Sequence, residues 1–101
     1  MDSGDAGKTN AATAGPMFKN LSLDLGGKNP NISFDDCDIE SALTTSLNSS
    51  FANQGQICLC GSRMYIQRGI YNEFRDRFVQ LVKEMKVGDP KDSESKLGAV
   101  V

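Results

Sequence analysis

The chain has 101 residues, and 11 Lys and Arg against 13 Asp and Glu give it a formal net charge of −2. A chain of this length forms one domain or part of one, so a large independent enzyme is excluded. Charged residues make up 24% and hydrophobic residues 39% of the chain, fractions typical of globular domains rather than of disordered, collagen-like or coiled-coil proteins.

The charge pattern and the apolar runs disfavour two kinds of partner. Lys and Arg form no block or stripe of the kind that nucleic-acid binding needs to displace counterions. The apolar runs are far shorter than the roughly 20 residues that span a bilayer, and the N-terminus lacks the features of a signal peptide. We therefore expect no nucleic-acid partner, no membrane and a cytoplasmic location.

The cysteines and the lack of histidine limit the chemistry. Cys37, Cys58 and Cys60 are too few for a disulfide-rich secreted scaffold, which indicates free thiols in a reducing compartment. Because the chain has no His, a thiol within it must act without an imidazole base. Three cysteines alone do not supply the four ligands of a structural zinc ion, so we expect no metal site.

The first third of the chain predicts a loop followed by two short strands. Residues 1–17 are rich in Gly, Ala, Ser, Thr and Asp, which is typical of a loop or a mobile terminus. Residues 7–9 read Gly-Lys-Thr, as in a phosphate-binding P-loop, but Asp2 stands where that motif begins with Gly. Leucines alternate with polar residues over 20–25, which predicts a half-buried strand. A second short strand is expected over 31–34.

Apolar residues spaced three and four apart predict two amphipathic helices. The first covers about 38–53 after three aspartates that can cap it, and its apolar face comprises Ile39, Ala42, Leu43, Leu47 and Phe51. The second is ended by Gly88 and Pro90, and its apolar face comprises Phe74, Phe78, Leu81, Val82 and Met85. Between them, residues 63–67 have the composition of a strand. Residues 91–101 begin polar and end apolar, so we expect the chain to stop within another element.

Asp24 and Cys58 are the candidate reactive residues. Asp24 ends the first predicted strand beside a pair of glycines, and Cys58 follows the first helix in a Gly-containing loop where backbone amides can be exposed. Together they can form a thiol active site. On spacing alone an alternative is favoured, in which Cys58 is a small buried apolar residue and Asp24 a polar residue at a strand end.

Two segments carry a family resemblance. Residues 23–28 read LDLGGK and residues 51–58 read FANQGQIC. They resemble the Leu-Glu-Leu-Gly-Gly-Lys and Phe-x-x-x-Gly-Gln-x-Cys signatures of the NAD(P)-dependent aldehyde dehydrogenases, and residues 49–60 are most similar to the 2-aminomuconic semialdehyde dehydrogenases. The resemblance implies an α/β fold in which 18–101 are a partial catalytic domain, with short strands alternating with two amphipathic helices. Residues 1–17 are then a remnant of the cofactor domain.

The resemblance also implies a reaction. Cys58 would attack an aldehyde to form a thiohemiacetal, a hydride would pass to NAD or NADP, and the resulting thioester would be hydrolysed to a carboxylic acid. The backbone N–H of Cys58 would help to hold the oxyanion, while Cys37 and Cys60 are bystanders. The family's glutamate base falls on Asp24, whose side chain is shorter by about 1.5 Å, and we expect slower thioester hydrolysis for that reason.

The cofactor site is expected to be incomplete. Residues Ser3, Leu25 and Gly26 would border NAD or NADP, and residues 2–8 resemble a degraded copy of the family's phosphate loop. The resemblance places the rest of the cofactor domain, an oxyanion-binding asparagine and the oligomerisation strands outside this chain. We expect a fragment that binds NAD weakly on its own, from a homo-oligomeric family that acts on small aldehydes.

Two other interpretations stay open. The chain can be a non-catalytic remnant or interaction module of the same fold, in which the aspartate at position 24 marks relaxed function. A weaker alternative is a small redox-active thiol protein that uses Cys58 and Cys60.

Overall fold

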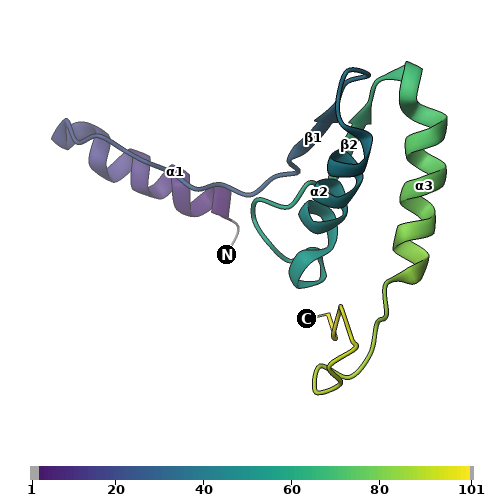
Figure 1. Ribbon diagram of the computed structural model, residues 1–101. Coiled ribbons are helices and arrows are strands. Elements are labelled where there is room, and N and C mark those ends of the chain that lie inside the picture. Colours follow the sequence, from purple (N-terminus) through teal and green to yellow (C-terminus); the bar gives the residue numbers. More distant parts are fainter. Residues whose placement is uncertain (1–2, 101) are drawn as a thin grey trace.

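A computed structural model describes residues 3–100 of the chain (Figure 1). In chain order, its elements are α1 (Ser3–Ala14), η1 (Gly15–Met17), β1 (Pro30–Ser33), α2 (Ile39–Phe51), η2 (Ala52–Gly55), β2 (Arg63–Ile66), η3 (Arg68–Ile70) and α3 (Tyr71–Glu84). Helix α1 stands away from the other helices and strands. The radius of gyration is 18.4 Å, against about 13 Å for a compact domain of 100 residues, so the molecule is extended.

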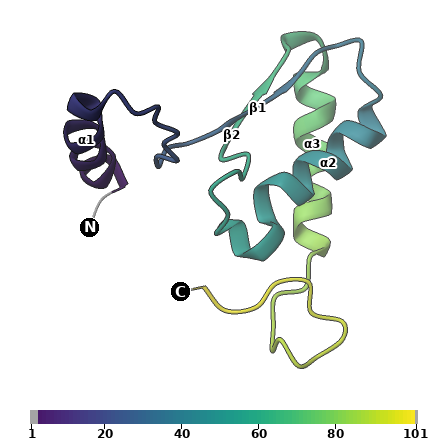
Figure 2. The same ribbon diagram turned by 90° about the vertical axis from the view of Figure 1, so that its left-hand side faces the viewer.

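The two strands form a parallel pair whose register joins Pro30 to Arg63 and Ser33 to Ile66. Parallel strands need a long crossover connection, and α2 with the loop after it provides one. Helices α2 and α3 pack against each other, side by side in Figure 1, and in Figure 2 α2 crosses in front of α3 with the strands to the left. The predicted strands over 31–34 and 63–67 are confirmed to within one residue at each end.

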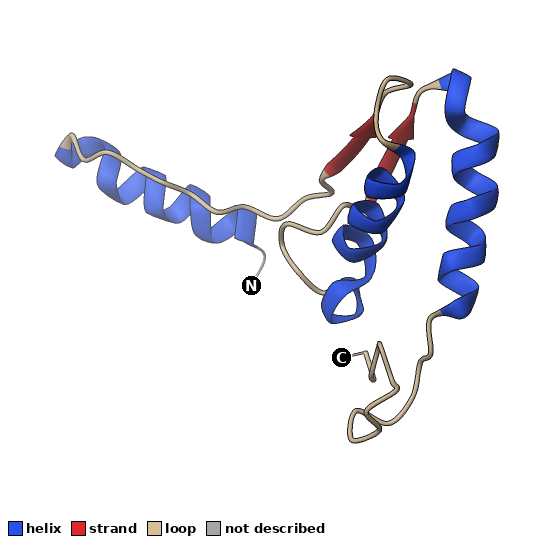
Figure 3. Cartoon of the chain, in the orientation of Figure 1, coloured by secondary structure: helices blue, strands red, loops and turns tan. Residues whose placement is uncertain are grey.

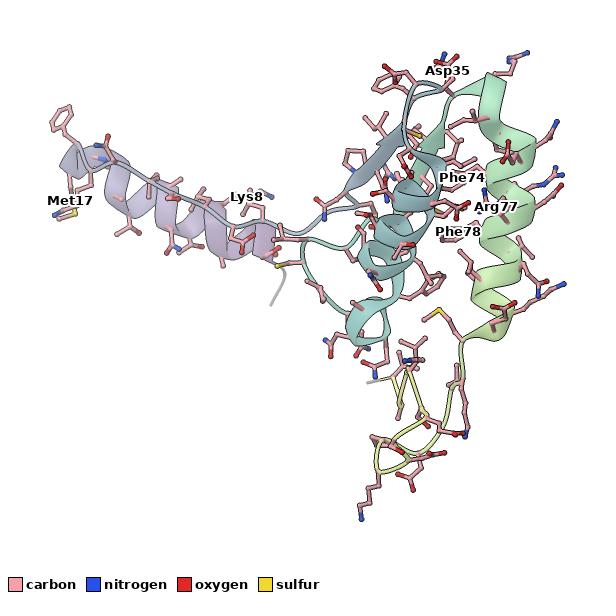
Figure 4. The ribbon with its side chains drawn as sticks, viewed as in Figure 1. Lys8, Met17, Asp35, Phe74, Arg77 and Phe78 are labelled. Atoms are coloured by element: carbon pink, nitrogen blue, oxygen red, sulfur yellow. The ribbon has the colours of Figure 1, made fainter. Side chains whose placement is uncertain are left out.

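The core lies between α2 and α3. Leu43 of α2 is 1% exposed and Phe74 of α3 is 2% exposed, and Phe78 stacks on Phe74 with ring centroids 5.8 Å apart (Figure 4). Aromatic pairs of this kind add about 0.5–1.5 kcal/mol beyond the area that they bury. Both predicted helices are thus confirmed, and Ser41 N–H donates to the carboxylate of Asp38 at 2.8 Å as a helix N-cap.

The prediction of a loop over 1–17 is wrong for the described residues, because Ser3–Ala14 form helix α1. The segment contains four alanines, which have the highest intrinsic helix propensity. The hydroxyls of Thr9 and Thr13 donate to the carbonyls of Asp5 and Thr9, which satisfies these side chains within the helix. The helix has no apolar stripe, and this is why its sequence resembles a loop.

The predicted strand over 20–25 is also wrong, since residues 19–29 contain no strand. Figure 3 shows this segment as a loop that runs back along α1. Its leucines pack against the helix instead of a sheet, and a Cβ atom on the buried Gly7 would lie 2.7 Å from the Leu25 side chain. A strand needs a neighbour for its backbone hydrogen bonds, and none of the described residues provides one here.

The end of the described chain is held by a turn rather than by a further helix or strand. Helix α3 ends at Glu84, before Met85, and a single bridge joins Val87 to Leu97. Lys86 forms ion pairs with Asp92 at 2.8 Å and Glu94 at 3.2 Å. No helix within residues 3–100 is long and apolar enough to cross a membrane.

Candidate active site

Cys58 lies in an exposed turn between η2 and β2. The N–H of Cys60 donates to the carbonyl of Ile57 at 3.0 Å and closes this turn. The alternative in which Cys58 is a buried apolar residue is therefore wrong, because the residue is exposed and its thiol is free. An exposed thiol in a turn is accessible to an electrophile.

An unusual backbone conformation precedes the turn. Asn53, Gln54 and Gly55 have φ values of 51°, 59° and 74°, so three successive residues adopt the left-handed conformation. Such a conformation is unfavourable for Gln and persists only when neighbouring contacts hold it. Asn53 supplies two of them, because its side chain donates to the carbonyl of Gln56 at 3.2 Å and its carbonyl accepts from the Gln56 N–H at 3.0 Å.

The other end of the turn is fixed to helix α2 through Gly61. The Gly61 N–H donates to the carbonyl of Ser49 at 3.0 Å and to its hydroxyl at 3.1 Å, and the Ser50 hydroxyl donates to the Gly61 carbonyl at 3.0 Å. A Cβ atom at Gly61 would lie 2.7 Å from the Ser49 hydroxyl. The absence of a side chain at this position therefore permits the close approach of the turn to α2.

Asn29 joins the turn to the segment that contains Asp24. Its side-chain amide donates to the carbonyl of Cys58 at 2.6 Å and to that of Cys60 at 3.3 Å. Asn29 is not among the site residues predicted from the sequence. The only local signal is its place between the Gly-Gly-Lys segment and Pro30, at the start of β1.

Asp24 lies with the predicted cofactor-binding residues on the surface of α1. The Gly26 N–H donates to the hydroxyl of Ser3 at 2.8 Å. A shallow hollow of about 180 Å³ is lined by Ser3, Ala6, Gly7, Asn10, Ser22, Leu23, Asp24 and Leu25. The structure thus brings Ser3, Asp24, Leu25 and Gly26 together. It places Cys58 outside this hollow, and Asn29 provides the connection between the two regions.

The volume of the hollow indicates whether these residues could enclose a nicotinamide cofactor. Pockets that enclose a ligand of drug or cofactor size have volumes of about 300–1,000 Å³. The hollow is smaller than this, so it does not enclose a dinucleotide. Its rim includes the Ser3 hydroxyl and the first turn of α1, whose amide groups favour anionic ligands.

The ion pairs with shifted pKa values lie outside the Cys58 turn and the hollow. Arg77 of α3, labelled in Figure 4, pairs with Glu40 of α2 and with Glu73 one turn earlier on α3, and both raise its pKa, with Glu40 the larger cause. The Lys86 ammonium donates hydrogen bonds to Asp92 and to Glu94, and these bonds raise its pKa, with Asp92 the larger cause. These groups stabilise the fold and the tail. Residues 3–100 contain no group of three or more His, Cys, Asp and Glu that could hold a metal ion.

Comparison with known proteins shows which family has this sequence. A model of the aldehyde dehydrogenase family matches residues 2–101. The chain is 51% identical over 86 residues to 2-aminomuconic semialdehyde dehydrogenase of Mus musculus, and the match covers 85% of this chain and 18% of that protein. The resemblance predicted from residues 49–60 is confirmed by this match.

Solved structures give the same result. Betaine aldehyde dehydrogenase from Staphylococcus aureus in complex with NAD+ is similar with a TM-score of 0.80 and 38% identity, over 95% of this chain and 19% of that one. An NADP dependent enzyme from E. coli is similar with a TM-score of 0.79 and 34% identity, over 92% of this chain and 19% of that one. The chain thus spans about a fifth of the length of the proteins that it matches. Since the family model matches nearly every residue and the fold agrees with these α/β structures, the chain belongs to the aldehyde dehydrogenase family.

Proposed function

We propose that this chain is part of an enzyme that oxidises a small aldehyde to a carboxylic acid with NAD or NADP, and that Cys58 is its nucleophile. The observation that carries the proposal is the pair of hydrogen bonds from Asn29 to the carbonyls of Cys58 and Cys60. These bonds join the segment of Asp24 to the turn of Cys58, although the two segments lie about 30 residues apart in the sequence.

Cys58 would form the bond to the substrate. The Cys58 thiolate adds to the carbonyl carbon of the aldehyde, and the carbonyl oxygen becomes an oxyanion. The Cys58 N–H has no acceptor among residues 3–100, so it is free to donate to this oxyanion. When bound, NAD or NADP supplies the hydride acceptor that the oxidation needs.

Asp24 would act on the thioester that follows. Its carboxylate takes a proton from water, the water oxygen attacks the thioester carbon, and the Cys58 thiolate leaves as the carboxylic acid forms. Asp24 is exposed, so water reaches it. Its short side chain holds the carboxylate further from the thioester than glutamate would, and displacements of about 1 Å cost on the order of 100-fold in rate.

The substrate, the assembly and the location belong to the same proposal. The likeness to 2-aminomuconic semialdehyde dehydrogenase supports a small aldehyde as substrate. The likeness to structures described with NAD+ and with NADP supports a nicotinamide cofactor, which Ser3, Leu25 and Gly26 would border. We further propose a homo-oligomer in the cytoplasm for the complete protein.

An acylation experiment tests the nucleophile without the cofactor. The purified chain is mixed with 4-nitrophenyl acetate, whose activated ester transfers an acetyl group to a nucleophilic thiolate and releases 4-nitrophenolate. We expect one acetyl group on Cys58, located by peptide mass spectrometry, and none in Cys58→Ser. The matched control Cys60→Ser is expected to be acylated like the unmodified chain. Equal acylation of the three cysteines, or none on Cys58, would overturn the proposal.

The exposed apolar side chains favour a second candidate, a non-catalytic interaction module. Phe18 is 98% exposed and Leu59 is 78% exposed, and side chains of this kind favour association with another surface. The same experiment separates the two candidates. A module of this kind predicts a folded chain that associates with itself or a partner while Cys58 shows no preference over Cys60.

A further inference from the structure

We propose that Asn29 is a positioning residue, whose side-chain amide fixes the orientation of the Cys58 turn and with it the directions of the Cys58 thiol and N–H. The catalytic meaning of this inference rests on the proposed role of Cys58. The positioning itself rests on hydrogen bonds within residues 3–100 and can be tested separately.

The amide is well matched to its two acceptors. A side-chain NH2 group has two N–H bonds, and the Asn29 nitrogen lies 2.6 Å from the Cys58 oxygen and 3.3 Å from the Cys60 oxygen. One group therefore restrains two peptide planes of the same turn. Asn29→Asp keeps the shape of the side chain but removes the N–H donor. Asn29→Ala removes both the shape and the donor, so each substitution removes the restraint in a different way.

The donor is carried by a rigid part of the fold. The Asn29 carbonyl accepts from the Arg63 N–H at 3.2 Å, which continues the pairing of β1 and β2 by one residue. Pro30 follows, and a residue before proline is restricted to extended backbone. Asn29 is also partly buried. The sheet thus determines where the amide nitrogen lies, and the turn adapts to it.

Apart from the bond from the Cys60 N–H to the Ile57 carbonyl, which closes the turn, few other hydrogen bonds restrain the turn near Cys58. Within residues 3–100, the hydrogen bond from Asn29 is the only one that reaches the main chain of Cys58 from a side chain. The anchors at Asn53 and Gly61 lie on either side of it. Without the amide, the peptide plane that follows Cys58 can rotate, and the thiol and the N–H then lose their fixed directions relative to the Asp24 segment.

Carbonyl spectroscopy tests the proposal directly. The chain contains three cysteines, so labelling cysteine with 13C at the carbonyl gives three signals, from Cys37, Cys58 and Cys60. In Asn29→Ala and Asn29→Asp we expect the Cys58 signal to move most, the Cys60 signal to move less and the Cys37 signal to stay. Asn29→Gln keeps the NH2 group and is expected to restore the Cys58 signal in part.

Thiol reactivity supplies the second readout. Asn29→Asp places a carboxylate next to the Cys58 carbonyl, and a nearby negative charge disfavours a thiolate. We expect alkylation of Cys58 by iodoacetamide to slow by about threefold or more in Asn29→Asp, while Cys37 reacts at an unchanged rate.

The matched control lies at the other end of the same strands. The Gln67 amide likewise makes two hydrogen bonds, to the Asp35 carboxylate at 2.7 Å and from the Asp35 N–H at 3.0 Å, but it does not touch the Cys58 turn. Gln67→Ala should leave the Cys58 and Cys60 signals in place. Unmoved signals in folded Asn29→Ala, or equal movement in Gln67→Ala, would overturn the proposal.

The unmodified chain provides a test that does not depend on a variant that folds. We expect the side-chain NH2 protons of Asn29 to exchange with solvent more slowly than those of the exposed Asn48, and equal exchange would contradict the proposal. A failure of acylation at Cys58 would overturn the proposed function alone, because the carbonyl signals and the exchange rates do not depend on catalysis.

Discussion

Two regions of the molecule are built differently: an N-terminal arm of residues 3–28 and a helix–strand body of residues 29–84. In the body, Leu43, Phe74 and Phe78 are buried between the two helices. In the arm, Gly7 is the only buried residue, and the contacts are a few leucines on one helix and the bond from Gly26 to Ser3. The body therefore has a core of its own, whereas the arm depends on local contacts, and the candidate site uses both.

The largest stability effect is expected in the body. Phe74→Ala removes a side chain that is 2% exposed together with its stacking on Phe78, so it should lower the free energy of unfolding by about 3–5 kcal/mol. Chemical denaturation followed by circular dichroism measures this. A loss below about 1 kcal/mol would mean that the body does not depend on this core.

A smaller effect is expected at the start of α2. Asp38→Ala removes the carboxylate that accepts from the Ser41 N–H, and loss of an N-cap costs about 1 kcal/mol. Asp38→Asn keeps an acceptor and serves as the matched control, with stability close to that of the unmodified chain. Equal losses in both variants would show that charge, rather than capping, is responsible.

A still smaller and local effect is expected in the arm. Ser3→Ala removes the acceptor of the Gly26 N–H, which at this exposed site should cost about 0.5 kcal/mol. Hydrogen exchange of the Gly26 amide should accelerate, while the amides of α2 and α3 exchange as before. Acceleration throughout the body would contradict the separation of the two regions.

The smallest effect is a pH dependence of the tail after α3. A hydrogen bond from Lys86 holds the pKa of Asp92 below its usual range. A carboxyl group with a lowered folded pKa stabilises the fold above its unfolded pKa of about 4, and this contribution is lost as the pH falls through the folded value. Below about pH 4 the Lys96 amide, which donates to the Lys86 carbonyl, should lose protection against exchange, measured relative to its intrinsic rate at the same pH. Lys86→Met should remove this pH dependence and leave the body unchanged.

The contrast between the regions also explains which parts of the fold follow from the sequence. Apolar residues at helical spacing predict α2 and α3 because each apolar face meets the other. The alternating leucines over 20–25 give the period of a strand but do not reveal that their partner is a helix. Helix α1 has no apolar stripe, so its helical structure depends on alanine content and on packing that sequence periodicity does not report.

The residues of the candidate site also differ in how far the sequence indicates them. Asp24 and Cys58 stand in motifs that can be read along the sequence, so the sequence alone names both as candidates. The sequence does not indicate Asn29, because its proposed role depends on the approach of a turn that lies 29 residues away in the sequence. The pairing of β1 with β2 creates this approach, and a hydrogen bond across that distance leaves no local pattern.

If Asp24 and Cys58 act in one site, Asp24 determines the lifetime of an acetyl group on Cys58. After acetylation of the chain by 4-nitrophenyl acetate, the thioester is followed by mass spectrometry in Asp24→Glu, in Asp24→Asn and in the unmodified chain. We expect faster hydrolysis in Asp24→Glu, by up to about 100-fold, and slower hydrolysis in Asp24→Asn. Equal lifetimes in all three folded chains would contradict a shared site.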